Sequence, residues 1–376
     1  MFRRYSIRNY SFKLIIYLIA LTIIGILVIG SAKQDLQIKQ IMGLILGLIG
    51  MTIISLIDYK LILKFAWILY AVDLIVLVLV LTNVGAAHKG AKRWIEIPGI
   101  DISFQPSELS KIILILFFAF FFQKYKEQIN TLKILILSAI LVGFPLVLVL
   151  KEPDLSTTIV TALIFVSLLF IAGLSYKIVI GGLAVAIPAF FVVLYLALQP
   201  DKSTLQGYQS RRILAWRYPK LYPDDALQTQ NSMMAIGSGQ LWGKGLYNND
   251  VTSVKNGNFI AEAHTDFIFS VVGEEMGFIG TAIVVILLLL IALECLRIAK
   301  HAQDLSGKLI CCGIGSLIAF QSFVNICVVT GLFPNTGVPL SFVSSGLTSL
   351  VTNFVGMGIV LNIGLQPRKY GSGDMT

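Results

Sequence analysis

The sequence predicts an all-α membrane protein with about ten transmembrane helices, and three observations lead to this prediction. Hydrophobic residues make up 56% of the 376 residues, charged residues only 13%, and the mean hydropathy is +0.85. Apolar runs of about 17 to 25 residues recur along the chain, which is the length a helix needs to cross the hydrocarbon core. Lys and Arg gather in alternate connections between these runs, as is typical of multi-span proteins.

The predicted spans follow one another along the whole chain. They lie near residues 12–31, 40–57, 61–82, 107–122, 132–150, 155–173, 178–198, 265–294, 309–331 and 343–364. The eighth run is long enough for a span preceded by a short re-entrant piece, because Gly273, Glu274, Glu275 and Gly277 interrupt it. No segment outside the spans is large enough to fold alone, so residues 1–376 are predicted to form a single domain.

The charge bias predicts the orientation of the chain. Ten spans place both termini on one side, and the connections on that side carry more Lys and Arg, so the termini are predicted to be cytoplasmic. The outward connections are then residues 83–106, 151–154, 199–264 and 332–342. The first apolar run has no small-residue cleavage site after it, which favours a retained span over a signal peptide.

Composition also excludes several classes of function. The net charge of +9 is mostly explained by the cytoplasmic bias, so it indicates anionic lipid as a partner and gives no argument for nucleic acid. The four cysteines have no C-x-x-C spacing, and the histidines are not clustered, so neither a disulfide framework nor a metal site is predicted. These cysteines are Cys295, Cys311, Cys312 and Cys327.

Asp266 is the candidate for catalytic chemistry, because it lies where the polar connection 199–264 runs into an apolar segment. A lone carboxylate at a membrane surface lies where water thins, an environment that suits a general base. The alternative is a helix N-cap, since Asp is a favoured capping residue and Thr265 precedes it. This segment alone leaves both interpretations open.

Charges within the predicted spans each need a partner or a role. Glu108 and Lys111 lie three residues apart in FQPSELSKI, where Pro106 suits a helix start and Ser107 is expected to cap it. The spacing places the pair on one helix face, so a structural salt bridge is one interpretation. The other is that Lys111 points into an outward cavity and contacts a phosphate. For Asp73, in the middle of a span, structural pairing is favoured.

Two outward connections combine basic and aromatic residues. In the first, Arg93 and Trp94 follow two lysines, which is typical of an interfacial anchor beside anionic head groups. In the long connection, GYQSRRILAWRYP alternates arginines with rings, and guanidinium groups bind phosphate while rings pack on sugar faces. A loop on the membrane surface explains this segment equally well. Its arginines are Arg211, Arg212 and Arg217.

Taken together, these stretches resemble the SEDS family of bacterial membrane proteins, which serve shape, elongation, division and sporulation. The resemblance covers nearly the whole chain and ten spans in the family's order. It is carried by SLIDYK, KGAKRWIEIPG with FQPSELSK, KEPDLSTT, GYQSRRILAW, QTQNSMMAIGSGQLWGKGL, AEAHTDFIFSVVGEEMG and FPNTGVPLSFVSSGLTSLV. Each motif alone is weak, but together they are highly specific.

The sequence departs from the family pattern at a few positions. Ala261 stands in the family's P-E-x-H-T-D motif, and Glu152 replaces the Gln of Q-P-D-L. The motif P-F-V-S-Y-G-G appears with Ser341, Ser345 and Leu347. None of these changes removes the acid. The Gly-Val-Pro-Leu segment and the short tails are more similar to the elongation members, the RodA group, than to the division members, the FtsW group.

The resemblance implies a peptidoglycan glycosyltransferase that polymerises lipid II on the outer face of the bacterial cytoplasmic membrane, with a class B penicillin-binding protein, a transpeptidase, as partner. It implies that Asp266 takes the proton from the acceptor GlcNAc 4-hydroxyl, which attacks the donor's anomeric carbon with inversion. Undecaprenyl diphosphate leaves, and its charge calls for Arg, Lys or a divalent cation such as Mg²⁺ or Mn²⁺. The substrate-binding candidates are Arg93, Trp94, Glu108, Lys111, Arg211, Arg212 and His264.

Other functions remain as alternatives. A lipid II flippase would place essential charges on both sides of a path through the bundle, whereas the family-matching charges cluster outside. A non-catalytic scaffold gives no reason for an acid at the mouth of a cavity. The division or sporulation paralogue of the same family is the alternative to the elongation role.

Overall fold

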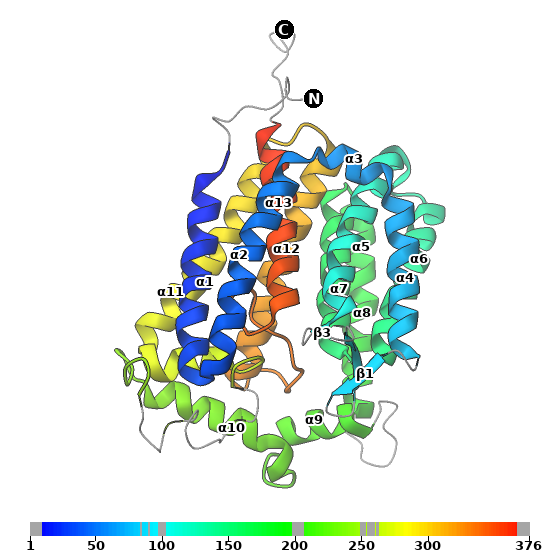
Figure 1. The fold of residues 1–376 in the computed structure, drawn as a ribbon. Coiled ribbons are helices and arrows are strands. Elements are labelled where there is room, and N and C mark those ends of the chain that lie inside the picture. The colour runs from blue at the N-terminus through cyan, green and yellow to red at the C-terminus, as the bar shows by residue number, and fades with distance from the viewer. Residues whose placement is uncertain are drawn as a thin grey trace.

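Long helices form the body of the protein, as the sequence predicts (Figure 1). The structure is a computed structural model that describes residues 10–82, 85–88, 91–96, 103–197, 207–248, 253, 260 and 263–366. The helices of the bundle are α1 (Phe12–Ala32), α2 (Gln34–Leu56), α3 (Tyr59–Lys64), α4 (Ala66–Leu81), α5 (Pro106–Lys124), α6 (Leu132–Lys151), α7 (Leu155–Ile171), α8 (Tyr176–Ala197), α11 (Ile268–Lys300), α12 (Leu305–Val329) and α13 (Leu347–Leu365). A short 3-10 helix, Lys126–Gln128, follows α5.

The multi-span prediction is confirmed. Seven helices within the described ranges are long and apolar enough to cross a membrane: α1, α2, α5, α6, α11, α12 and α13. Two further apolar helices, α4 and α7, are shorter. Large apolar side chains such as Ile16 (62% exposed) and Ile68 (60% exposed) cover the outside of the bundle, where lipid rather than water accounts for their exposure. The exact number of ten spans stays a prediction.

Aspartates start three of the helices and so explain part of the charge near the spans. Asp58, Asp154 and Asp304 accept hydrogen bonds from the backbone N–H groups at the beginnings of α3, α7 and α12. Inside a span, Ser110 Oγ donates to Asp73 Oδ2 at 2.8 Å, which agrees with the structural pairing predicted for Asp73. These acids therefore stabilise the bundle.

The first and the last helix of the bundle have their outer ends on the same side of the molecule. The start of α1 and the end of α13 are at the same end of the bundle in Figure 1, while α9 (Gly207–Arg217) and α10 (Pro223–Ser238) lie across the opposite end. This arrangement agrees with an even number of crossings. Which end faces the cytoplasm stays a prediction from the charge bias.

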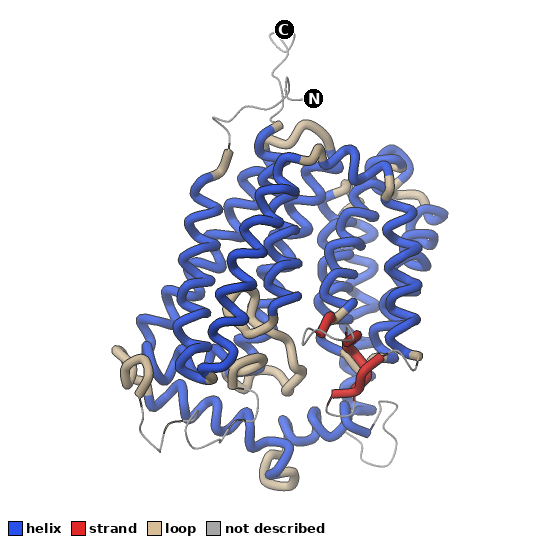
Figure 2. Tube along the Cα trace, in the orientation of Figure 1, coloured by secondary structure: helices blue, strands red, loops and turns tan. Residues whose placement is uncertain are grey.

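A small sheet that was not predicted from the sequence occupies the connection between α4 and α5 (Figure 2). Trp94 pairs with Ala86, and Ile95 pairs with Phe104, so all neighbouring strands run antiparallel. The sheet, whose strand β2 carries Arg93 and Trp94, lies at the end of the bundle that also carries α9 (Figure 1). Its strands are β1 (Gly85–His88), β2 (Ala91–Glu96) and β3 (Ser103–Phe104).

Helix α5 lies at the centre of the bundle and packs against α4, α7 and α12. Most of its residues are buried, as expected of a helix surrounded by others, and after the polar first turns it is almost entirely apolar, with Phe117 and Phe121 almost completely buried. The helix begins with Gln105 at the N-cap and Pro106 in the first turn. The predicted cap at Ser107 is therefore wrong by two residues, because Ser107 already lies inside the first turn.

Helix α11 is broken at Gly277, whose φ of 62° and ψ of −161° are not helical. This confirms the predicted interruption. The segment that follows α10 fills the break: its Lys244 and Gly245 N–H groups donate to the carbonyls of Glu274 and Glu275, both at 2.9 Å. The Gln240 and Leu241 carbonyls accept hydrogen bonds from the N–H groups of the two residues that follow Gly277. Four backbone groups freed by the break are therefore satisfied within the protein.

Candidate functional site

A cavity of about 640 Å³ opens at the end of the bundle that carries the sheet and α9. Its wall comes from the turn between α1 and α2, from β2 and β3, from α9, and from the segments before α11 and α13. The polar and aromatic residues in this wall include Lys33, Arg93, Trp94, Gln105, Arg212, His264, Asp266, Ser345 and Ser349. The structure thus brings five of the predicted site residues, Arg93, Trp94, Arg212, His264 and Asp266, around one space.

Asp266 lies in a turn directly before α11. The helix begins at Ile268 with Phe267 at the N-cap position, so the structure does not support the alternative that Asp266 is the N-cap. A Cβ on Gly337 would lie 3.1 Å from Asp266 Oδ2 and 3.8 Å from Arg212 Nη1. The carboxylate and the guanidinium therefore approach the same glycine.

The backbone around Asp266 is held from two sides. Asn325 Nδ2, on α12, donates to the Asp266 carbonyl at 2.7 Å. Ser344 Oγ, in the segment before α13, donates to the Thr265 carbonyl at 2.7 Å. Because the polypeptide is fixed on either side, the carboxylate is presented to the cavity from a rigid base.

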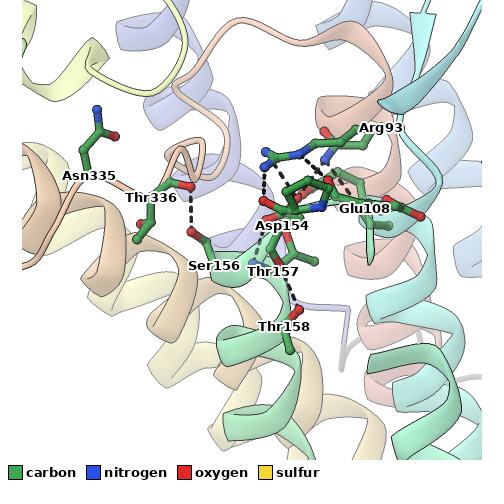
Figure 3. A network of polar contacts seen from close by, with 12 residues as sticks. Arg93, Glu108, Asp154, Ser156, Thr157, Thr158, Asn335 and Thr336 are labelled. Carbon is green, nitrogen blue, oxygen red and sulfur yellow. Dashed lines mark hydrogen bonds and ion pairs between the residues drawn. The ribbon is translucent and has the colours of Figure 1, made fainter. Parts of the chain in front are cut away.

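Arg93 joins the sheet to the turn between α6 and α7 (Figure 3). Its Nε donates to the Glu152 carbonyl at 2.9 Å, its Nη2 donates to the Pro153 carbonyl, and its Nη1 lies 3.8 Å from Asp154 Oδ2. Asp154 in turn accepts from the Thr157 N–H at 3.0 Å and caps α7. Part of the Arg93 guanidinium is therefore committed to this turn, while its side chain also lines the cavity.

Glu152 is fully buried in the same turn, and neither carboxylate oxygen has a hydrogen-bond partner among the described residues. Burial raises the pKa of Glu152 to about 8, and the neighbouring Asp154 carboxylate adds to the rise, while Arg93 opposes it. Its side chain is therefore mostly protonated at neutral pH. A neutral Glu here resembles in charge the Gln that the SEDS pattern has at this position.

The buried pair of Glu108 and Lys111 lies behind the cavity wall. Lys111 Nζ is 2.7 Å from Glu108 Oε1, and both residues are at least 96% buried. Lys111 Nζ also donates to Gln321 Oε1 at 2.6 Å, and Ser349 Oγ donates to Glu108 Oε2 at 3.0 Å. The predicted ion pair is present, and neither of its members lines the cavity.

Arg211 and Arg212 are separated by the helical geometry of α9, since successive residues on a helix point in different directions. Arg212 lines the cavity, and its Nη1 donates to the Asn335 carbonyl at 3.2 Å. The Arg211 side chain is 69% exposed, and its Nε lies 3.9 Å from Asp225 Oδ2. Only Arg212 belongs to the cavity wall.

Two contributors to the site were missed in the sequence analysis. Lys33, in the turn between α1 and α2, lines the cavity and was not among the predicted site residues. Its position in a short outward turn beside the first span is a signal that could have identified it. Asn325 holds Asp266, but an amide within an apolar helix carries no local signature of this role. The departure at Ala261 lies outside the described residues.

This arrangement places one carboxylate among several cations. Lys33, Arg93 and Arg212 line the same cavity as Asp266. A carboxylate can accept a proton, and Lys and Arg can stabilise a phosphate or a departing diphosphate. Within the part of the chain that the structure describes, no group of three His, Cys, Asp or Glu side chains could hold a metal ion. The site thus suits acid–base chemistry on an anionic substrate.

Comparisons with known proteins agree with this geometry. The family model for cell cycle proteins of the FtsW, RodA and SpoVE type matches residues 8–369. The protein named probable peptidoglycan glycosyltransferase FtsW from Trichlorobacter lovleyi is 35% identical, over 96% of this chain and 94% of its own length. Peptidoglycan glycosyltransferase MrdB of Escherichia coli K12 is 36% identical, over 93% of this chain and 92% of its own length.

Solved structures show the same architecture. A chain from a peptidoglycan synthase complex that coordinates polymerization and crosslinking superposes with a TM-score of 0.77 at 28% identity, covering 94% of this chain and 97% of that chain. The rod shape determining protein RodA of Thermus thermophilus superposes with a TM-score of 0.68 at 27% identity, covering 94% of this chain and 96% of that chain.

Proposed function

The chain belongs to the cell cycle protein family of FtsW, RodA and SpoVE, and we propose that it is a peptidoglycan glycosyltransferase that polymerises lipid II at the outer face of the bacterial cytoplasmic membrane. One observation supports this most directly: the Asp266 carboxylate and the Arg212 guanidinium both lie beside Gly337 and line one cavity at the end of the bundle. A proton acceptor beside a phosphate-binding cation is what transfer from a lipid-linked diphosphate requires.

In this mechanism Asp266 accepts the proton from the 4-hydroxyl of the acceptor GlcNAc. The hydroxyl oxygen forms a bond to the anomeric carbon of the donor sugar from the side opposite the diphosphate, so the configuration inverts. The bond between that carbon and the diphosphate oxygen breaks, and undecaprenyl diphosphate leaves with the electron pair. Arg212, Arg93 and Lys33 stabilise its negative charge. One acid is enough, because a diphosphate is already a good leaving group.

The elongation role and the partner are further parts of this proposal. The Gly-Val-Pro-Leu segment that resembles the elongation members contributes Gly337, Pro339 and Leu340 to the cavity wall. Overall identity does not separate the two roles, since the FtsW and MrdB relatives are 35% and 36% identical. The likeness to a chain of a synthase complex supports a class B penicillin-binding protein as the transpeptidase partner.

The test is polymerisation of purified lipid II by the purified protein, with and without the transpeptidase. Asp266→Asn keeps the side-chain volume but removes the proton acceptor, so the rate should fall by at least about a hundredfold. Asp224→Asn is the matched control, because Asp224 is exposed on α10 and lies outside the cavity. Near-normal glycan strands from Asp266→Asn would refute the assignment of the general base.

A further inference from the structure

Helix α12 presents two buried side-chain amides, one turn apart, to the wall of the cavity. Gln321 Nε2 donates to the Pro339 carbonyl at 3.1 Å. Asn325 Nδ2 donates to the Val338 carbonyl at 2.6 Å and to the Asp266 carbonyl at 2.7 Å. Both residues are 1% exposed. Both amides therefore hold the segment Gly337–Leu340, and Asn325 also holds the polypeptide that carries the acid.

The orientation of the Asn325 amide follows from its neighbours. Both contacts are carbonyl oxygens, so the nitrogen must face them, because an amide oxygen in that place would meet two acceptors. The Asn325 Oδ1 atom is then buried without a hydrogen-bond partner among the described residues. The Asn325 nitrogen satisfies two buried carbonyl oxygens that an apolar side chain would leave without this donor. Its two hydrogen bonds, and not its packing volume, therefore distinguish Asn from an apolar residue at this position.

Gln321 also contacts the buried ion pair. Gln321 Oε1 accepts from Lys111 Nζ at 2.6 Å, and Lys111 is paired with Glu108 at 2.7 Å. Because the donor is charged, this hydrogen bond is stronger than one between neutral groups, and it fixes the Gln321 amide toward Pro339. The pair thus reaches the cavity wall through the Gln321 amide, which donates to Pro339, and through Ser349, whose hydroxyl donates to Glu108 Oε2.

We propose that Gln321 and Asn325 are positioning residues that hold the Asp266 carboxylate against the segment Gly337–Leu340, and that the Glu108–Lys111 pair acts through Gln321 rather than by binding phosphate. This rests on the proposed function of Asp266. The spacing is tight, since a Cβ on Gly337 would stand only 3.1 Å from Asp266 Oδ2. A small shift of either segment therefore changes the position of the proton acceptor relative to the substrate.

The test compares two buried asparagines. Asn325→Leu keeps a similar shape but removes both donors, so the kcat of polymerisation should fall roughly ten- to a hundredfold, while the KM for lipid II stays within about twofold. Asn362→Leu is the control, because Asn362 is also buried on an apolar helix and binds backbone on both sides, through Ser55 and Tyr59, at the far end of the bundle. It should lower the melting temperature at least as much, yet leave kcat per folded molecule within about twofold.

The outcomes are separable. An unchanged kcat for Asn325→Leu, or an equal loss of kcat in Asn362→Leu, would refute the positioning role. If Asn325→Leu does not fold, Asn325→Ala, which introduces no clash, carries the same comparison. Activity in Asp266→Asn would instead refute the proposed function on which the inference rests.

A double-mutant cycle tests the ion pair. Gln321→Met removes the amide, and Glu108→Gln with Lys111→Met removes both charges together. If the pair acts through Gln321, combining all three changes should lower kcat no further than either set alone. If Lys111 binds phosphate directly, the losses should multiply and the KM for lipid II should rise, and that result would overturn the proposal.

Discussion

Two adjacent arginines on α9 lie in different surroundings, and this difference predicts separate roles. Arg212 lines the cavity, whereas the Arg211 side chain is 69% exposed beside Asp225. Arg212→Lys keeps the charge but loses the planar guanidinium, so turnover of lipid II should fall roughly tenfold. Arg211→Lys should leave turnover unchanged and serves as the matched control. An equal loss of turnover in both variants would contradict separate roles for the two arginines.

The raised pKa of Glu152 predicts that the stability of the protein depends on pH. Its pKa in the folded protein is raised from 4.5 to about 8, so the folded state holds one more proton than the unfolded state between these values. Stability is therefore fully present below about pH 4.5 and is lost as the pH rises toward 8. Gln does not titrate, so Glu152→Gln keeps its stability as the pH rises. The free energy of unfolding of this variant should equal that of the unmodified protein near pH 4.5 and exceed it by about 3 kcal/mol at pH 8.

The measurement for Glu152 is the melting temperature of both proteins in detergent across this pH range. Glu127→Gln provides the control, because Glu127 is exposed in the short 3-10 helix after α5. Its difference from the unmodified protein should not change with pH. A constant difference for Glu152→Gln as well would show that the buried carboxyl does not titrate in this window.

At the scale of elements, the break in α11 depends on a close approach of two backbones. Gly243, with φ of +81°, lies so near the first half of α11 that a Cβ would stand 2.2 Å from the Glu275 carbonyl oxygen. Gly243→Ala should therefore destabilise the protein by more than about 2 kcal/mol. Gly237→Ala is the control: it lies within α10 with no atom near the new Cβ, so helix propensity should make it neutral or stabilising. Similar melting temperatures for the two variants would contradict this account.

The sequence predicted elements well where the lipid environment leaves few options. A segment in the bilayer must satisfy its own backbone, so long apolar runs predict helices such as α5 and α12 directly. The strands β1 to β3 were missed, because each has two to six residues and depends on its partner strand rather than on its own pattern. The break at Gly277 was predicted, since small and charged residues interrupt an apolar run there.

The site was predicted in part, for similar reasons. Asp266 stands out locally as a lone acid at the start of an apolar run, and the structure places it in the cavity. That Lys111 lies behind the wall was not visible, because i,i+3 spacing gives a pair but not the direction in which it points. Asn325 and Lys33 contribute through contacts between distant segments, which only the folded chain defines.

At the scale of the whole molecule, the cavity lies at one end of the bundle and the described ends of the chain lie at the other (Figure 1). The excess of Lys and Arg on the side of the termini predicts that side to be cytoplasmic. The cavity then opens at the outer membrane–water boundary. This is where a lipid-linked sugar can present its diphosphate while its chain stays in the bilayer.

Labelling of single introduced cysteines in intact cells tests this orientation. Lys220→Cys, exposed between α9 and α10, should react with a membrane-impermeant maleimide, whereas Lys126→Cys, exposed after α5, should react only once the membrane is permeabilised. The four native cysteines are buried, so replacing them by Ala gives a silent background with the same surface. The reverse pattern would place the cavity in the cytoplasm. Asp266 could then not act on lipid II at the outer face, because the cavity that holds it would open toward the opposite leaflet.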